Sequence, residues 1–307
     1  DKSFKREFFA EKGIGGALAC LFLLSTGQDK YLPRVKEYFQ QFPPDVTKIG
    51  NITWDNGYNG IACAEYYLRT GDRSVLPILQ YYCDDAKLRQ SFGCGWGHWG
   101  FTPNPGYVAG GLMNPAGAQV LTTLILAKEC GVEVDQGTFN RALTFFYRFA
   151  GHEAVPYGDH RPEGWLSCNG KNGMLAAAMS LLDGKAYRMA AQTMSLDMAD
   201  SYRWLAAGHT GGGFDVIWRG LGSVHVPKDQ HDHYRRQFRA LGVGSVPFLS
   251  PDLRPLGRAF GVCHRNRTLG VFNGQFFDPG HSSVHREKAG RSEDSDLFRF
   301  HCGFCVH

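Results

Sequence analysis

The sequence predicts an all-α fold, an α/α toroid built from helical hairpin repeats. The first observation is that helical hairpins recur along the chain, and that their first helices are apolar on nearly every side. Such helices are enclosed in the folded protein, which favours an inner ring surrounded by an outer one. The second observation is a set of long linkers rich in Gly, Trp, His and Asn, at 43–57, 91–116, 150–172 and 207–227. Long irregular loops in a compact domain are usually functional, whereas an open superhelix has short, uniform ones.

The clearest repeat pairs "GALACLFLLSTGQDKYLPRVKEY" (16–38) with "GIACAEYYLRTGDRSVLPILQYY" (60–82). Each unit is expected to be an apolar helix, a Thr-Gly stop, a short turn and a second helix. Gly27 and Gly71 are placed to end the first helix in a left-handed conformation. Pro33 and Pro77 fit the first turn of the second helix, where a missing N–H costs least. Weaker copies at 117–149 and 173–205 extend the pattern.

The composition is that of an ordinary globular protein, with 307 residues, 43% hydrophobic, 20% charged and a net charge of +4. Basic residues are spread out, so we expect no nucleic-acid partner. No apolar run is long enough for a membrane span. We expect one toroid domain over 1–241 and an irregular tail over 242–307, where the helical periodicity stops. This tail is either an irregular extension or a stretch in which the reading frame is lost.

The chain begins at Asp1 and not at Met, so we expect a fragment or a processed product from which a targeting segment is missing. An exported or periplasmic location stays open, as does the oligomeric state. No cofactor and no metal are expected, because the CxxC of Cys302 and Cys305 has no second pair at finger spacing. Three cysteines in apolar, helix-like runs are expected to be buried thiols: Cys20, Cys63 and Cys130.

Five motifs in consecutive order resemble the bacterial proteins grouped as domain of unknown function 6288. They are "WDNGYNGIACAEYYLRTGD", "GWGHWG", "VPYGDH", "NGKNGMLAAAMSLL" and "GHTGGGFDVIW". The resemblance covers about residues 10–240 and implies an α/α toroid distantly similar to terpene cyclases and protein prenyltransferases. It names no activity, and fold alone does not dictate chemistry. The aspartate-rich acid motif of squalene-type cyclases is absent, because "CDDAK" (83–87) falls in a helix of the second hairpin. The zinc triad of prenyltransferases is not recognisable either.

Four residues are candidate catalytic groups. Glu65 takes the place of a buried leucine in the first hairpin, so its carboxylate must face a polar cavity or a partner. His98 stands among glycines and tryptophans, which suits a pocket floor where an imidazole titrates near neutrality. Asp159 is followed by His160, and together they offer an acid/base pair. His209 precedes three glycines, which permit the close approach of a ligand.

Seven residues in the same linkers are expected to bind the substrate: Trp96, Trp99, Tyr157, His160, Asn169, Lys171 and Thr210. The two tryptophans would stack on the flat face of a sugar. Asn169 and Lys171 lie at a helix N-terminus, which attracts anions or hydroxyl groups. Each also has a purely structural interpretation, as a packed loop residue, a solvated turn or a helix cap.

The expected function is an acid/base enzyme, a hydrolase or lyase, which acts on a polar small-molecule or glycan substrate in the toroid mouth. Linkers that enter inner helices should emerge at one end of the toroid, so we expect the four catalytic candidates to converge there. One alternative is a non-catalytic glycan-binding, peptide-binding or scaffold module. A second is an enzyme of the terpene-cyclase or prenyltransferase kind, which an aromatic-lined dry cavity would favour.

Overall fold

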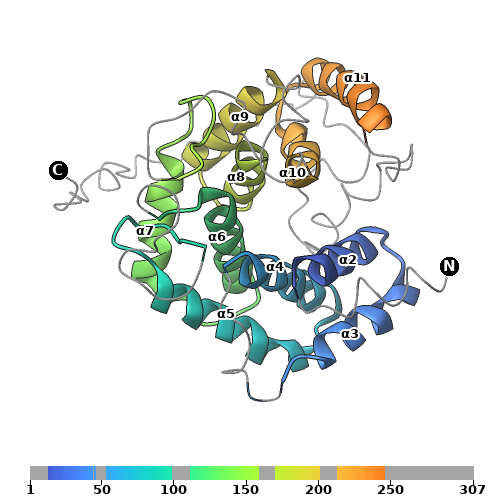
Figure 1. The fold of residues 1–307 in the computed structure, drawn as a ribbon, viewed down its shortest axis with the longest axis vertical. Coiled ribbons are helices and arrows are strands. Elements are labelled where there is room, and N and C mark those ends of the chain that lie inside the picture. The colour runs from blue at the N-terminus through green and yellow to red at the C-terminus, as the bar shows by residue number, and fades with distance from the viewer. Residues whose placement is uncertain are drawn as a thin grey trace, which may run out of the picture. The chain divides into compact units, whose positions relative to one another are not determined.

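The computed structural model describes residues 13–43, 45, 53–98, 111–158, 170–200 and 213–245, all of which lie within one compact unit. The regular elements in these ranges are helices, and none of the residues described forms a strand. The helices are arranged in two rows, an inner one and an outer one (Figure 1). The all-α class predicted from the sequence is therefore confirmed.

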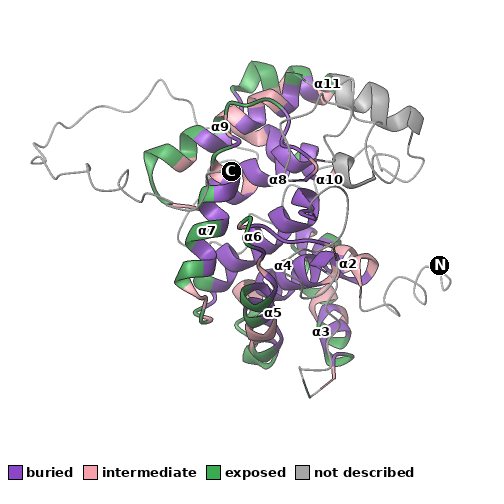
Figure 2. Ribbon diagram, turned by 60° about the vertical axis from the view of Figure 1, so that its left-hand side comes forward, coloured by how far each residue is buried: buried purple, intermediate pink, exposed green. Residues whose placement is uncertain are grey.

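The inner row consists of α2 (Ile14–Ser25), α4 (Thr53–Thr70), α6 (Asn114–Glu129), α8 (Lys171–Ser180) and α10 (Gly213–Gly222). Each helix packs against the next one in this order. Figure 2 shows most of their described length as buried, and α6 is buried without interruption from Asn114 to Ala127. Apolar and small residues on all faces suit these helices to enclosure on every side.

The outer row consists of α3 (Leu32–Gln40), α5 (Leu76–Arg89), α7 (Gln136–Tyr147), α9 (Lys185–Asp200) and α11 (Lys228–Ser245). The helices α3, α5, α7 and α9 each pack against the inner helix that precedes them in the chain. Short 3-10 helices lead into three of the five: Asp29–Tyr31, Arg73–Val75 and Ser223–His225. The outer helices bury one face and expose the other (Figure 2), as the amphipathic sequences of α3, α7 and α11 require.

The glycine and proline signals that were predicted to end and begin the helices are present in the first two repeats. Gly27 and Gly71 adopt left-handed conformations, with φ of +69° and +71°. The amide of Gly71 donates to the carbonyl of Tyr67 (2.7 Å), which closes the last turn of α4. Both α3 and α5 carry their proline in the first turn, at Pro33 and Pro77. These residues therefore set where each inner helix stops and each outer helix starts.

Two of the predicted linkers are partly wrong. The helix α4 begins at Thr53, inside the expected linker 43–57, and α10 occupies much of the expected linker 207–227. Glycines had argued against a helix in both places, because each costs about 1 kcal/mol in a helix interior. The structure supplies the compensation at Gly57 of α4 and Gly222 of α10, which lie where two inner helices cross closely.

The crossing of α4 over α6 leaves no room for a methyl group. A Cβ on Gly57 would lie 2.8 Å from the Cβ of Gln119, and one on Gly60 would lie 2.6 Å from the Oγ1 of Thr123. At the crossing of α8 and α10, a Cβ on Gly173 would lie 2.7 Å from the carbonyl carbon of Trp218. Real Cβ contacts are longer than this, so the inner row can pack this closely only around glycine.

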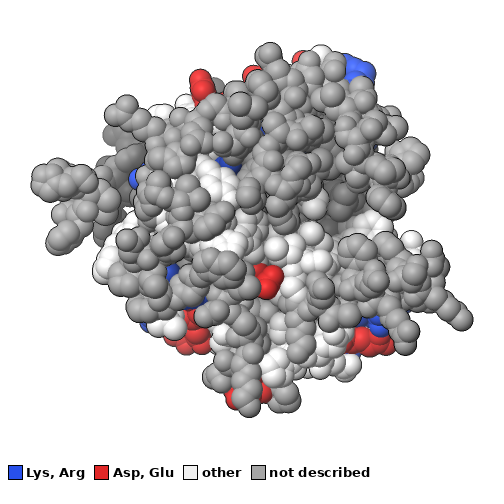
Figure 3. Space-filling view, in the orientation of Figure 1, with Lys and Arg blue, Asp and Glu red and all other residues white. Residues whose placement is uncertain are grey.

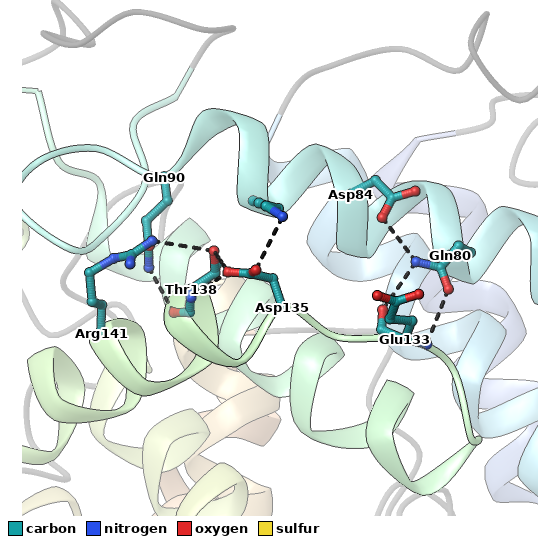
Figure 4. Close-up of polar contacts among 8 residues, drawn as sticks. Gln80, Asp84, Gln90, Glu133, Asp135, Thr138 and Arg141 are labelled. Carbon is teal, nitrogen blue, oxygen red and sulfur yellow. Dashed lines mark hydrogen bonds and ion pairs between the residues drawn. The ribbon is translucent and has the colours of Figure 1, made fainter.

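Polar contacts join the neighbouring outer helices α5 and α7 (Figure 4). The Gln80 side chain both donates to the carbonyl of Glu133 (3.0 Å) and accepts from its amide (3.1 Å). Asp135 caps α7 by accepting from the Thr138 amide (2.8 Å), and it pairs with Lys87 of α5 (3.1 Å). These hydrogen bonds and this ion pair lower the pKa of Asp135 to about 2.

The core holds the thiols that the sequence predicted to be buried. Four cysteines in it are free and buried: Cys20, Cys63, Cys83 and Cys130. Burial raises the pKa of each thiol, in the case of Cys83 to about 12, so these groups are unreactive in the folded protein. In the part of the chain that the structure describes, no helix is long and apolar enough to cross a membrane. No group of three or more metal-ligating His, Cys, Asp or Glu occurs there either.

Candidate functional site

Two linkers meet at one end of the inner row, beside the first residues of α4 and α6. The amide of Thr53 donates to the carbonyl of His98 (3.3 Å), and the amide of Met113 donates to the carbonyl of Trp96 (2.8 Å). The linker before α8 joins them there through Asn114. We call this region the linker end and define it as residues 53–54, 96–98, 113–114, 153–158 and 171–172.

The helices α4, α6 and α8 all begin at the linker end, because an outer helix returns the chain to that end after each inner helix (Figure 1). The first turn of a helix carries unsatisfied N–H groups and a partial positive charge. Three such ends close together favour polar oxygens and anions over apolar ligands. In the view of Figure 3, most of the described Lys, Arg, Asp and Glu side chains lie towards the margins of the molecule, and one acidic patch lies near the centre among neutral side chains.

His98 is half-buried and contacts two buried side chains of the inner row. Its Nδ1 atom lies 3.1 Å from Nε1 of Trp54 and 3.4 Å from Sδ of Met113. The same Trp54 nitrogen lies 2.9 Å from the Met113 sulfur. The imidazole is therefore held on its Nδ1 side by residues that are themselves fixed by packing, which is what a precise binding group needs.

Asn114, the first residue of α6, fixes the backbone of the next linker. Its Nδ2 donates to the carbonyls of Pro156 and Gly158 (both 2.9 Å), and its amide donates to the carbonyl of Tyr157 (2.8 Å). Three consecutive carbonyls of the linker are thus bound to one buried residue. This arrangement sets the position of Tyr157 relative to the start of α6.

Asn172, in the first turn of α8, holds the beginning of the same linker. Its Nδ2 donates to the carbonyl of Glu153 (2.8 Å) and its Oδ1 accepts from the amide of Val155 (2.9 Å). Glu153 has φ of +59°, a conformation that costs a non-glycine residue about 1 kcal/mol or more. The N-cap residue of α8 is Gly170, so no asparagine side chain caps this helix. Asn172 forms its hydrogen bonds with the linker instead.

Lys171 is the first residue of α8, and its side chain is only 1% exposed. Its Nζ atom lies 5.8 Å from the centroid of the Tyr157 ring, at the outer limit of a cation–π contact. A buried ammonium costs several kcal/mol unless polar or aromatic groups surround it. Lys171 and Tyr157 therefore form a cationic and aromatic corner of the linker end.

A buried ion pair anchors the end of α5 to the start of α4, directly before the linker that carries His98. Nε of Arg89 donates to Oδ1 of Asp85 (2.8 Å), and Nη1 of Arg89 donates to Oγ1 of Thr53 (2.6 Å). Asn56 also donates to Asp85. The aspartates of "CDDAK" thus lie on an outer helix, as expected. Asp85 serves packing there, because both of its carboxylate oxygens are engaged.

The structure does not bring Glu65 to the linker end. Glu65 lies about three helical turns beyond Trp54 along α4, a separation of about 16 Å at the rise of an α-helix. It is buried near Cys130 at the far end of α6, and its charge helps to raise the pKa of that thiol, after burial. The expected convergence of Glu65 with His98 is therefore wrong. The cause is the early start of α4 at Thr53.

Trp96 is buried in the core. Its side chain is 1% exposed, its Nε1 donates to the carbonyl of Ala86 (2.8 Å), and its ring packs beside Gly117 of α6. The indole is thus packed between the backbone of α5 and the start of α6. The expected stacking of Trp96 on a substrate is therefore corrected to a role in the core.

Asp197 near the end of α9 is an unusual carboxylate that the sequence did not single out. Its Oδ2 atom is buried and has no hydrogen-bond partner among the described residues. Burial and the charges of Asp200 and Glu153 raise the pKa of Asp197 to about 6, while His152 opposes the shift. Perturbed acids gather at functional sites, and Glu153 belongs to the linker end. No local signal in "SLDMAD" could have revealed it.

Residues 4–242 match the profile of a family described as a domain of unknown function, number 6288. The match spans more than half of the chain. The chain belongs to this family. No curated protein and no solved structure matches the sequence. Because the family carries no assigned activity, the site of this domain 6288 protein has to be judged from its geometry.

The family match includes every candidate site residue of this domain 6288 protein. The structure brings His98, Tyr157 and Lys171 to the linker end, where Trp96 is also found but is buried, and it leaves Glu65 in the core away from that end. Six candidates lie outside the described residues: Trp99, Asp159, His160, Asn169, His209 and Thr210. The predicted tail and its cysteine pair, Cys302 and Cys305, lie outside them too. Sequence reasoning missed Trp54, Met113 and Asn114, which hold the site in place.

Proposed function

We propose that the linker end is the substrate site of an acid/base enzyme, a hydrolase or lyase that acts on a polar, glycan-like substrate. His98 and Tyr157 are the described residues that would meet the substrate, and the buried ammonium of Lys171 would lie behind the Tyr157 ring. Asp159, the residue after Gly158 in the chain, is the proposed carboxylate partner. Acid or base groups held in this way typically accelerate a reaction by about 10²- to 10⁴-fold.

The observation that carries the proposal is an unbroken series of contacts across three linkers. Nδ1 of His98 lies 3.4 Å from Sδ of Met113, and the backbone amide of the adjacent Asn114 donates to the backbone carbonyl of Tyr157 (2.8 Å). The centroid of the Tyr157 ring then lies 5.8 Å from Nζ of Lys171. An imidazole, a phenol and an ammonium thereby share one end of the helical row. A core that served only packing would not need three such groups together.

We also propose the α/α toroid as the complete architecture. The alternation of inner and outer helices supports it, as does the common end at which the inner helices begin. The similarity to terpene cyclases and prenyltransferases, and a bacterial origin, are parts of the same proposal.

A non-catalytic glycan-binding, peptide-binding or scaffold module is the main alternative, because the same groups could hold a ligand without reacting with it. The cyclase-like alternative has less support. Nε1 of Trp218 donates to the hydroxyl of Tyr58 (2.8 Å), and the two rings stack with centroids 5.9 Å apart. These aromatic rings pack against each other, whereas a cyclase would present such rings to a cavity.

The test is to incubate the purified protein with a panel of neutral and uronic-acid-containing oligosaccharides and to follow product formation by mass spectrometry. His98→Ala is the test variant. His233→Ala is the control, because His233 is an exposed histidine on α11, outside the linker end. Both variants should keep the helical circular dichroism of the parent protein.

The proposal expects turnover of at least one oligosaccharide, a loss of about 10²-fold or more with His98→Ala, and no change with His233→Ala. Binding without turnover would move the assignment to a binding module. Turnover that is equal in the two variants would overturn the placement of the site.

A further inference from the structure

The second half of α9 lies against the beginning of the linker that carries Tyr157. A Cβ on Gly151 would lie 3.7 Å from Cγ2 of Thr193, which is an ordinary van der Waals distance. Thr193 and Asp197 share one face of α9, because residues four apart are neighbours on a helix surface. Asp197 therefore faces the same linker, and the charge of Glu153 acts on its carboxyl group. We call residues 151–158 the linker segment.

Asp197 is a half-buried carboxylate with incomplete hydrogen bonding. Its Oδ2 atom is buried and accepts no hydrogen bond from the residues that the structure describes. An oxygen in this position is better accommodated with a proton than with a negative charge. Burial and the charges of Asp200 and Glu153 raise the pKa of Asp197 to about 6. Geometry and charge therefore both favour the protonated form.

The charges that act on Asp197 come from α9 itself and from the linker segment. His152, beside Glu153, lowers the pKa of Asp197 and so opposes the two carboxylates. The other elements packed against α9 are α8, α10, α11 and the 3-10 helix Ser223–His225. These elements carry titratable side chains that do not contribute to the shift: Lys171, Arg219, His225, His231 and Asp232.

Glu153 is held against α9 at a local cost. Its φ of +59° lies in the left-handed region, which is unfavourable for a residue with a side chain. Asn172 compensates from α8, since its Nδ2 donates to the carbonyl of Glu153 (2.8 Å) and its Oδ1 accepts from the amide of Val155 (2.9 Å). A few hydrogen bonds thus keep this strained turn in place, and repulsion between the carboxylates of Glu153 and Asp197 works against them.

We propose that Asp197 and Glu153 form a proton-controlled contact, which keeps the linker segment closed on α9 when Asp197 is protonated and lets it open when both carboxylates are ionised. The protonated carboxyl group of Asp197 is a hydrogen-bond donor that the Glu153 carboxylate can accept from, whereas two carboxylates repel each other. The proton that leaves Asp197 goes to water, so the contact needs no other reactant.

The direction of the pH dependence follows from the raised pKa. A carboxyl group whose pKa is higher in the closed segment than in the open one favours closing while it is protonated. Closing is therefore most favourable below about pH 4 and loses this contribution as the pH rises from 3.8, the ordinary value for aspartate, to about 6. If opening restores half of the raised pKa, which allows for the partial exposure of Asp197, the opening equilibrium should increase roughly tenfold.

The consequence for the linker end rests on the proposed function, whereas the contact itself does not. Tyr157 belongs to the linker segment, so opening would move a residue that is proposed to meet the substrate. The substrate site should therefore be better formed, and bind its oligosaccharide more tightly, at mildly acidic pH than at neutral pH.

The first experiment measures the contact without any ligand, by amide hydrogen exchange followed by NMR. The reporter is the amide of Val155, whose hydrogen bond to Asn172 is lost when the segment opens. After correction for the intrinsic pH dependence of exchange, its protection should fall about tenfold between pH 4 and pH 7 relative to amides in the middle of α6.

Asp197→Asn is the test variant, because its amide cannot ionise, and it should keep the protection of Val155 nearly constant over this range. Asp200→Asn is the matched control on the same helix, where an exposed carboxylate is replaced, and it should retain the fall. A fall as large in Asp197→Asn as in the parent protein would overturn the proposal. So would protection in the parent protein that does not change with pH. If Asp197→Asn does not fold, Glu153→Gln decides the question, since it removes the opposing charge and should also reduce the fall.

The second experiment measures KM against pH with the oligosaccharide that the panel identifies. KM of the parent protein should increase between pH 4 and pH 7, and this increase should be smaller in Asp197→Asn. The same increase in both proteins would overturn the regulation of the site and leave the contact standing. Absence of turnover in the parent protein would contradict the proposed function, whereas the contact would still be decided by the exchange measurements.

Discussion

The close crossing of α8 and α10 predicts opposite effects for two glycine-to-alanine substitutions in the inner row. In Gly173→Ala, the new methyl group would lie 2.7 Å from the carbonyl carbon of Trp218 and 3.0 Å from the amide nitrogen of Arg219. Carbon atoms attract each other best at about 3.5 to 4.0 Å. The obstacle is the backbone of α10, which cannot rotate away as a side chain could.

The expected magnitude follows from two terms. Alanine gains about 1 kcal/mol over glycine as a helix former. Overpacking against a fixed neighbour costs about 1 to 3 kcal/mol or more, and a backbone contact this short places Gly173→Ala at the upper end. We expect a net loss of about 2 kcal/mol in the free energy of unfolding, measured by urea denaturation followed by circular dichroism.

Gly220→Ala on α10 is the matched control. Gly220 is exposed, its φ is negative, and a Cβ there would meet no heavy atom within 4 Å. Only the helix-propensity term remains, so Gly220→Ala should stabilise the protein by up to about 1 kcal/mol. The packing argument fails if Gly173→Ala is as stable as the parent protein or shifts in the same direction as the control.

Three further predictions concern titration and reactivity. The pKa of Asp197 is about 6 in the folded protein against 3.8 in the unfolded chain, so its effect on stability becomes unfavourable as the pH rises from about 4 to 6. At pH 7, Asp197→Asn should therefore raise the free energy of unfolding, measured by urea denaturation, by about 1 kcal/mol after allowance for the partial exposure of Asp197. At pH 3 the same substitution should give no gain, and an equal gain at both pH values would contradict this. The pKa of Asp135, about 2, gives the opposite sign. The stabilisation that Asp135 gives is complete above pH 4 and is lost as the pH falls towards 2, so in Asp135→Asn the free energy of unfolding should depend less on pH between 4 and 2. An unchanged acid transition would refute the role of the cap. Among the thiols described, Cys94 is the one that is not buried, so peptide mapping after brief labelling of the native protein should find it modified well before Cys63; equal labelling of both would contradict the burial of Cys63.

The repeat units could be predicted from the sequence because their signals are local. A glycine with positive φ and a proline in the first turn act within a few residues, and Gly27, Gly71, Pro33 and Pro77 have the predicted roles. The family resemblance was recognisable for a similar reason, since its motifs are continuous stretches.

The candidate site was harder to predict, because it depends on residues that are distant in the sequence. Gly57 indicated a linker when considered locally, but together with Gly60 it belongs to a helix that crosses α6 closely. Because α4 begins at Thr53, earlier than expected, Glu65 lies farther from the start of the helix than expected. Trp96 suited a pocket wall when considered locally, but its burial depends on contacts with Ala86 of α5 and Gly117 of α6. The partners of His98 had no sequence signal at all.

The most direct test of the linker end as a substrate site is a crystal structure with an oligosaccharide that the protein turns over or binds. We predict electron density for the sugar beside His98 and Tyr157, with a substrate oxygen within hydrogen-bonding distance, about 3.2 Å, of one of these two side chains. Density at another place, such as the Glu65 end of the inner row, with the linker end empty, would contradict the assignment.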